Sequence, residues 1–225
     1  MFRQHGLRPP AGAGPHSRSL SGAIIDGMLL GRRIWSGSVD VIIVVDMQVG
    51  LLDDAPKHDL DGVLDRINAL TAMVRRGGGK VIWIRHCGQS GDGFEPHTPG
   101  WEFLPALILQ SDDIIIEKTL NDPFVGTQLA TLLAGLAPRR VLIAGWATDF
   151  CVDATVRSSV SRDHHVVVVS DGHTLSDRPH LGATAVIAHH NWVWSGLISN
   201  RSIRLATTHE LLSEAGSVAR LDRPA

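Results

Sequence analysis

The sequence alternates short, continuously apolar runs with longer segments of helical periodicity, and this alternation constrains the fold more than any other feature. The runs cover residues 39–45, 80–86, 113–118, 140–145, 165–170 and, more weakly, 202–207. Nearly all are apolar at successive positions, which is typical of strands covered on both faces. Helix-period segments between such strands indicate a parallel sheet wrapped by helices. We therefore expect one doubly wound α/β domain with a six-stranded parallel sheet.

The helical period is clearest at residues 59–76, where the apolar residues share one helical face. Asp59 is expected to cap the start of this helix, and residues 77–79, all glycine, to end it. Further helices are expected at 126–135, 149–162 and 179–200. No internal repeat or linker marks a second domain.

Residues 1–27 differ from the rest, because they are rich in Gly, Pro, Ser and His and lack periodicity. Such a segment buries too little surface to offset its ordering entropy, so we expect a disordered extension before a single domain at 28–225. Two alternatives stay open: a weak organelle-targeting peptide, or a true start at Met28.

Composition excludes several classes of protein. Lys plus Arg number 21 and Asp plus Glu number 23, so the net charge of -2 offers no basic field for nucleic acid or a membrane surface. No stretch approaches the roughly 18 apolar residues of a membrane span. The two cysteines, Cys87 and Cys151, are too few for a disulfide scaffold. They fit a reducing compartment, and we expect a cytoplasmic protein.

Three polar residues fall at the carboxyl ends of the predicted strands, where ligands bind in doubly wound sheets. Asp46 directly follows the first run, and Lys118, one of three lysines, ends the third. Cys151 follows the fourth run in what we expect to be the first turn of a helix capped by Thr148 or Asp149. There the free N–H groups and the helix dipole would stabilise a thiolate. Each residue alone has an ordinary structural explanation, but together they suggest a nucleophile, a base and a cation.

The residues around these positions resemble the isochorismatase-like cysteine hydrolases. The resemblance rests on VIIVVDMQVG, VIWIRH, TPGWEFLPAL, IIIEKTLNDPFVGTQL and VLIAGWATDFCVDATVR. It extends from about residue 39 to about residue 200, and it implies a three-layer α/β/α fold.

The resemblance also implies a catalytic triad of Asp46, Lys118 and Cys151. In it, the Cys151 thiolate attacks a carbonyl carbon, Asp46 accepts and returns the proton, and Lys118 keeps Asp46 ionised. The family carries a non-proline cis peptide that corresponds to the bond between Trp146 and Ala147. The N–H groups of Ala147 and Cys151 would then form an oxyanion hole.

Within the family, Cys151 favours the amidohydrolases, which cleave amide, lactam or ureido C–N bonds, because isochorismatases proper typically lack the cysteine. Nicotinamidases add a metal-binding Asp-x-His cluster. The stretch after the first strand offers only Asp53, Asp54 and His58, without that spacing. We therefore expect no metal and no cofactor. Isochorismatase-type or nicotinamidase-type hydrolysis remains an alternative, as does a non-catalytic binding protein on the same fold.

Five residues are candidates for binding the small-molecule substrate: Gln48, Trp101, Phe124, Trp146 and His173. The aromatic residues flank the triad in sequence and would exclude water from the site. His173 is expected to follow the fifth strand at the same sheet edge. The tryptophans of the run AHHNWVW are expected at a subunit contact, because the family suggests a homo-oligomer. Cys87 is taken as a spectator thiol, with a regulatory disulfide to Cys151 as the alternative.

Overall fold

The computed structural model describes residues 39–53 and 55–221. The predictions for residues 1–27 and for a start at Met28 lie outside the described residues. Within these described ranges, no helix has both the length and the apolar character needed to cross a membrane.

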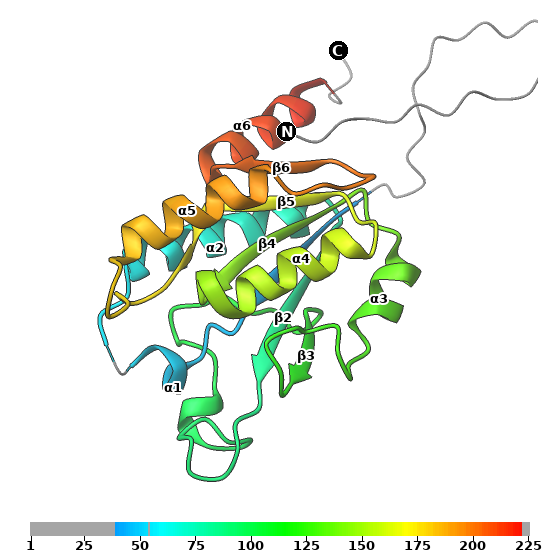
Figure 1. Cartoon of the computed structure of the whole chain (residues 1–225). Helices are drawn as coiled ribbons and strands as arrows, with labels where there is room; N and C mark the ends of the chain where they lie inside the picture. The colour runs from blue at the N-terminus through cyan, green and yellow to red at the C-terminus, as the bar shows by residue number, and fades with distance from the viewer. Residues whose placement is uncertain (1–38, 54, 222–225) are drawn as a thin grey trace, which may run out of the picture. The chain divides into compact units, whose positions relative to one another are not determined.

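The core of the protein is one sheet of six parallel strands in the order β3-β2-β1-β4-β5-β6 (Figure 1). The strands are β1 (Asp40–Val45), β2 (Lys80–His86), β3 (Ile114–Lys118), β4 (Arg140–Trp146), β5 (Val166–Thr174) and β6 (Ile203–Ala206). The chain winds outward from β1 in one direction and from β4 in the other, so the strand order reverses between these neighbours. This is the doubly wound sheet that the sequence predicts, and the prediction is confirmed.

Helices cover both faces of the sheet, giving the expected three layers (Figure 1). Helices α2 (Leu60–Arg76) and α6 (Thr208–Leu221) pack on one face. Helices α3 (Leu129–Leu136), α4 (Asp153–Ser161) and α5 (Ala183–Ser195) pack on the other. Three short elements complete the fold: α1 (Val49–Leu52), the 3₁₀ turn η1 (Pro99–Trp101) and the π-helical turn η2 (Thr148–Val152).

Strand β1 shows why its run is apolar throughout. Side chains of a strand alternate between the two faces. Ile42 and Val44 pack in the α2 layer, whereas Val41, Ile43 and Val45 pack in the layer of α3 to α5. All five are fully buried. Both faces of this strand are therefore core, and no polar position remains between Asp40 and Asp46.

Two predicted boundaries are wrong. β5 continues to Thr174, because the β4–β5 register shifts between Ile143 and Gly145 and pairing then resumes between Gly145 and His173. His173 therefore lies inside β5 and not after it. The helix expected from residue 179 begins at Ala183 instead.

At α2, Asp59 makes no side-chain cap hydrogen bond and instead pairs with Arg66. Helix α6 was not among the expected elements. The helix predicted at 126–135 forms at Leu129–Leu136.

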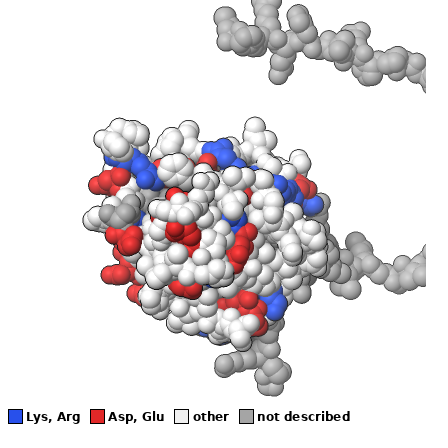
Figure 2. Space-filling model, turned by 90° about the horizontal axis from the view of Figure 1, so that it is seen from below, with Lys and Arg blue, Asp and Glu red and all other residues white. Residues whose placement is uncertain are grey.

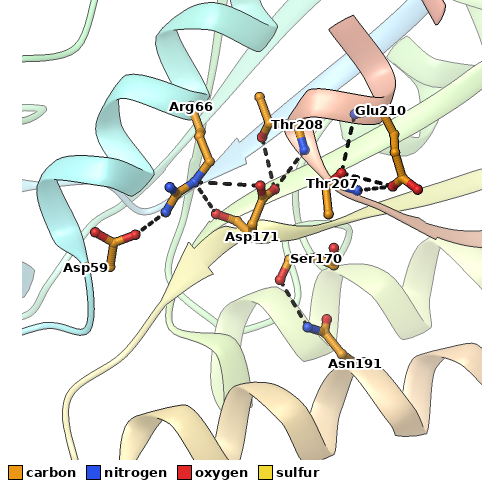
Figure 3. A network of polar contacts seen from close by, with 8 residues as sticks. All are labelled: Asp59, Arg66, Ser170, Asp171, Asn191, Thr207, Thr208 and Glu210. Atoms are coloured by element: carbon orange, nitrogen blue, oxygen red, sulfur yellow. Dashed lines mark hydrogen bonds and ion pairs between the residues drawn. The ribbon is translucent and has the colours of Figure 1, made fainter. Parts of the chain in front are cut away.

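Polar contacts near the end of β5 fasten helices to both faces of the sheet (Figure 3). On one face, Arg66 of α2 donates to the carbonyl oxygen of Asp171 at 2.6 Å. The Asp171 carboxylate accepts from the backbone and hydroxyl of Thr208, at the start of α6, at 2.9 and 3.0 Å. On the other face, Asn191 of α5 donates to the carbonyl oxygen of Ser170 at 3.0 Å. The end of β5 is thus held by three helices.

Candidate active site

The fold brings together the three polar residues predicted at the strand ends. The Lys118 ammonium lies 2.6 Å from the Asp46 carboxylate and 3.3 Å from the Cys151 sulfur. The side chains of Asp46 and Lys118 have no exposed surface. Lys118 also donates to the carbonyl oxygen of Leu120 at 3.0 Å. A buried ammonium therefore connects a carboxylate to a thiol.

The ends of β1 and β4 approach closely at this site. Gly145 has a φ of 127°, a conformation that L side chains rarely adopt, and a Cβ there would lie 2.2 Å from the Val45 carbonyl oxygen. Only glycine permits this approach. It carries the chain from β4 into η2 directly beside Asp46, which follows Val45. The bond between Trp146 and Ala147 is cis, as the resemblance implies.

Cys151 lies in the π-helical turn η2 that precedes α4, and neither predicted cap is present. η2 has no side-chain cap hydrogen bond. The Thr148 hydroxyl contacts the His173 ring and the Thr174 carbonyl oxygen instead. The Asp149 carboxylate pairs with both Nε and Nη2 of Arg178, at 2.8 and 2.6 Å. The turn is therefore held by side chains from the end of β5 and the segment after it.

Burial dominates the electrostatics of these polar side chains at the strand ends. It raises the pKa of Asp46, although the neighbouring Lys118 acts in the opposite direction. It also raises the pKa of the Cys151 thiol to about 12, and the charge of Asp46 adds to this. The expected stabilised thiolate is thus not the resting form. Desolvation and a nearby carboxylate outweigh Lys118, and Cys151 rests as a thiol.

Two of the predicted substrate-binding residues are occupied elsewhere. The Gln48 amide group is fully buried, donates to the carbonyl oxygens of His86 and Trp101 at 2.9 and 3.0 Å, and accepts from the His86 N–H at 2.6 Å. It joins β2 to η1. The Arg85 guanidinium stacks on the Trp101 ring, with its carbon 3.3 Å from the ring centroid. The Trp101 indole N–H donates to the Cys87 sulfur at 3.4 Å. Both side chains therefore form hydrogen bonds within the protein, near the end of β2 and the loop that follows it.

The other three candidates differ in position. Phe124 is buried, but its ring contacts His164 and the Arg162 guanidinium, which follow α4, whereas Cys151 precedes that helix. Trp146 is half-buried and packs against Ala147 and Leu175. His173 is 1% exposed, and its ring contacts Thr148 and Asn191 inside the protein. Its predicted place at the open edge depended on β5 ending earlier.

The comparison with family models identifies the chain. The model described as "Isochorismatase domain" matches residues 40–194, more than half of the sequence. The chain belongs to the isochorismatase family. Across the described residues of this isochorismatase-family protein, no group of three or more His, Cys, Asp and Glu side chains is placed to hold a metal ion.

Characterised relatives and solved structures agree with this assignment. A streptothricin hydrolase of Streptomyces noursei is 32% identical over 142 residues, which cover 63% of this chain and 51% of that protein. The chain thus spans about half the length of that relative. The ureidoacrylate amidohydrolase RutB of Methylorubrum extorquens is 26% identical over 61% of this chain and 70% of its own. A crystal structure of an isochorismatase family protein superposes with a TM-score of 0.68 at 27% identity, covering 75% of this chain and 98% of that one.

Two residues beside the triad of this isochorismatase-family protein were not predicted. Asn121 is exposed, and its amide oxygen lies 3.7 Å from the Cys151 sulfur. His86 ends β2 opposite Lys118, and its buried Nδ1 has no hydrogen-bond partner among the described residues. Burial and then the charge of Lys118 lower the pKa of His86, so the ring is neutral near pH 7. His86 could have been predicted as a site residue, because the sequence places it at a strand end. Asn121 could not, because the path of its loop brings it to Cys151.

Proposed function

We propose that this protein is a cysteine-dependent hydrolase that cleaves a C–N bond of a small molecule. The observation that carries the proposal is the buried Lys118 ammonium in contact with both the Asp46 carboxylate and the Cys151 sulfur. Cys151 is the nucleophile, Asp46 the general base and acid, and Lys118 the cation that balances their shared negative charge.

Proton transfer from Cys151 to Asp46 explains how a thiol with a raised pKa becomes a nucleophile. Losing the proton to solvent would leave two negative charges beside one ammonium, which is the state that the pKa of about 12 disfavours. Moving the proton to Asp46 keeps the net charge of the three side chains unchanged. The raised pKa of Asp46 makes it a better acceptor for that proton. The thiolate forms as the substrate arrives.

The reaction then proceeds in two halves. The Cys151 sulfur bonds to the carbonyl carbon, and the carbonyl π electrons move onto oxygen. Collapse of this tetrahedral species breaks the C–N bond, and the leaving nitrogen takes the proton from Asp46, which leaves a thioester on Cys151. Water then gives a proton to Asp46 and attacks the thioester, and the thiol leaves with that proton. The N–H groups of Ala147 and Cys151 are the proposed donors to the oxyanion.

The names of the relatives support C–N cleavage, since one is an amidohydrolase that acts on ureidoacrylate and another hydrolyses streptothricin. The face at the carboxyl ends of the strands supports a small substrate. Figure 2 shows mostly uncharged side chains there, with acidic groups across the middle and basic ones mainly near the edge. A nucleic acid would require a continuous basic field, and this face has none.

Turnover of a defined panel tests the proposal. The purified protein is assayed against primary amides, lactams, carbamoyl amines and ureido acids, with release of ammonia or amine as the signal. We expect Cys151→Ala to abolish turnover and Cys87→Ala to retain it. Acid-quenched wild-type protein should carry an acyl adduct on the peptide that contains Cys151. Turnover by Cys151→Ala at the wild-type rate would overturn the proposal.

Asn121 offers a narrower test, because its amide lies beside the sulfur and is free to face a substrate. Asn121→Ala is expected to lower kcat/KM by up to about tenfold, on the scale of one hydrogen bond. Asn68→Ala, which changes an asparagine bonded to the loop at Ala106 and Ile108, serves as the control. An unchanged kcat/KM in Asn121→Ala would remove Asn121 from the site.

We also propose that the protein forms homo-oligomers through α5. Trp192 on this helix is 73% exposed, whereas Trp194 of the same run is fully buried in the core, so only one of the two tryptophans is available for a subunit contact. Light scattering of the wild type and Trp192→Glu tests this, with a smaller mass expected for the variant.

A further inference from the structure

His173 is a buried polar residue and Asn191 a half-buried one. The proposed reaction uses neither, although both fall in motifs that the sequence singled out. His173 lies in β5, with both ring nitrogens in contact with polar partners. Its Nδ1 is 2.9 Å from the Thr148 hydroxyl, and its Nε2 is 3.1 Å from Oδ1 of Asn191. Burial lowers the pKa of His173 to about 4, so the ring is neutral near pH 7 and exists as one of two tautomers.

The contacts of Asn191 determine that tautomer. The Asn191 Nδ2 group donates to the carbonyl oxygen of Ser170 at 3.0 Å, and a carbonyl can only accept (Figure 3). The amide oxygen must therefore face the His173 ring. Because that oxygen is an acceptor, Nε2 of His173 carries the ring proton and Nδ1 presents a lone pair. The Thr148 hydroxyl donates to this lone pair.

This contact reaches the proposed nucleophile through the turn η2. Thr148 is the first residue of η2, directly after the cis peptide, and Cys151 lies in the same turn. The Thr148 hydroxyl has one proton and two acceptors within reach, because the Thr174 carbonyl oxygen is 3.2 Å away. The tautomer of His173 decides which of the two receives it.

Helix α5 holds the same segment at a second point. Trp194 donates from its indole N–H to the carboxylate of Asp153, the first residue of α4, at 2.8 Å. The His173 ring packs edge-on against Trp194, with 5.1 Å between ring centroids. Helix α5 thus contacts the chain on both sides of Cys151. Asn191 acts on Thr148 through His173, and Trp194 binds Asp153 directly.

We propose that Asn191 and His173 are positioning residues that orient the nucleophile turn through the hydroxyl of Thr148. The proposal rests on the proposed role of Cys151 as nucleophile. Neither side chain touches the substrate in this scheme. They fix the direction of one hydrogen bond at the start of η2, and through it the placement of the Cys151 sulfur beside Lys118.

Nitrogen-15 NMR of the histidine rings tests the tautomer without any assay of activity. We expect His173 of the wild-type protein at pH 7 to show the Nε2–H tautomer, with Asn191→Leu shifting it toward Nδ1–H. A wild-type ring protonated at Nδ1 would overturn the proposal, even if Cys151→Ala proves inactive. Conversely, turnover by Cys151→Ala would refute the proposed function and leave the tautomer result intact.

A double-mutant cycle tests the coupling to Thr148. Thr148→Val and Asn191→Leu are each expected to lower kcat about five- to tenfold with little change in KM. If both act through the same hydroxyl, the double variant should be no slower than the slower single variant. A double variant whose loss in kcat is the product of the two single losses would overturn the proposal. Asn68→Leu is the matched control and should leave kcat unchanged. If a variant does not fold, the NMR measurement on the wild-type protein decides the question.

Discussion

The two ends of strand β1 each carry an aspartate, and the two carboxylates have opposite properties. Asp40, at the start, lies near the surface and accepts hydrogen bonds from Arg139 at 3.0 and 2.9 Å and from Arg140 at 3.1 Å. Partial burial acts to raise its pKa, but the hydrogen bonds from Arg139 and then Arg140 outweigh it, so the pKa is lowered. Asp40 stays ionised and joins β1 to the start of β4.

Asp46, at the other end, is fully buried and lies beside one cation, Lys118. Its burial raises the pKa despite Lys118. The difference shows that the strand itself does not set the proton affinity of the carboxylate. The number of donors and the access of water set it. Two arginines make Asp40 a permanent anion, whereas one lysine in a buried site leaves Asp46 able to accept a proton.

The largest expected effect is on kcat, and it differs between substitutions of the two aspartates. Asp46→Asn removes the proposed proton acceptor and should lower kcat by about 10²- to 10⁴-fold. Asp40→Asn, at the opposite edge of the sheet, should leave kcat within about twofold. Steady-state turnover of a panel substrate measures both. Equal losses in the two variants would show that the contrast has no bearing on catalysis.

The second effect is on stability. Lys118→Met leaves the Asp46 carboxylate buried without a cation, and it should lower the free energy of unfolding by about 3 to 5 kcal/mol. The double variant Asp46→Asn/Lys118→Met removes the uncompensated charge and should recover most of this loss while staying inactive. Urea unfolding provides the measurement, with Arg139→Met at the exposed end as the control. If the double variant is no more stable than Lys118→Met, the buried charge does not explain the loss.

Alkylation of Cys151 tests the influence of Asp46 on the thiol. At pH 7 iodoacetamide should modify Cys151 more slowly than free glutathione, because the pKa of the thiol is raised to about 12. Asp46→Asn removes the negative charge and leaves Lys118 beside the sulfur, so the pKa should fall and modification should accelerate by about tenfold. Mass spectrometry of the Cys151 peptide in a Cys87→Ala background follows the rate. Fast wild-type modification at pH 7 would indicate a preformed thiolate.

The smallest effect is in the pH dependence of stability, and its sign differs between the two ends. The lowered pKa of Asp40 stabilises the folded state above the usual value of 3.8, and this contribution disappears as the pH falls through the lower folded pKa. The raised pKa of Asp46 destabilises the folded state as the pH rises from 3.8 through its folded pKa.

Unfolding curves at several pH values separate these signs. At neutral pH, Asp40→Asn should be less stable than the wild type by about 1 kcal/mol, with the gap closing in acid. Asp46→Asn should gain stability relative to the wild type as the pH rises. The same sign for both variants would contradict the comparison.

Much of this architecture follows from local sequence. All six strands start within one residue of their predicted positions, because the runs of apolar residues that form them are visible in the local sequence. The edge strand β3 differs in burial, since Ile115 and Glu117 are exposed. Asp46 and Lys118 interrupt or end such runs, so their location at the carboxyl edge was predictable. Cys151 was predictable from the motif around it, although its turn is π-helical and lacks the expected cap.

Other features depend on contacts between distant segments. The register shift beside Gly145 lengthens β5 and moves His173 from the open edge into the interior. Gln48 has the residue type of a substrate ligand, but the backbone of His86 and Trp101 takes up its amide. No periodicity or spacing in the sequence encodes these pairings.

The sequence by itself determined the order of the elements, the two-sided burial of the central strands and the identity of the three polar residues at the sheet edge, because each depends on residue type and local period. The tertiary structure alone decided their protonation. Whether Asp46 or Cys151 holds a proton depends on desolvation and on the 2.6 Å and 3.3 Å contacts of Lys118, which arise only when β1, β3 and η2 come together.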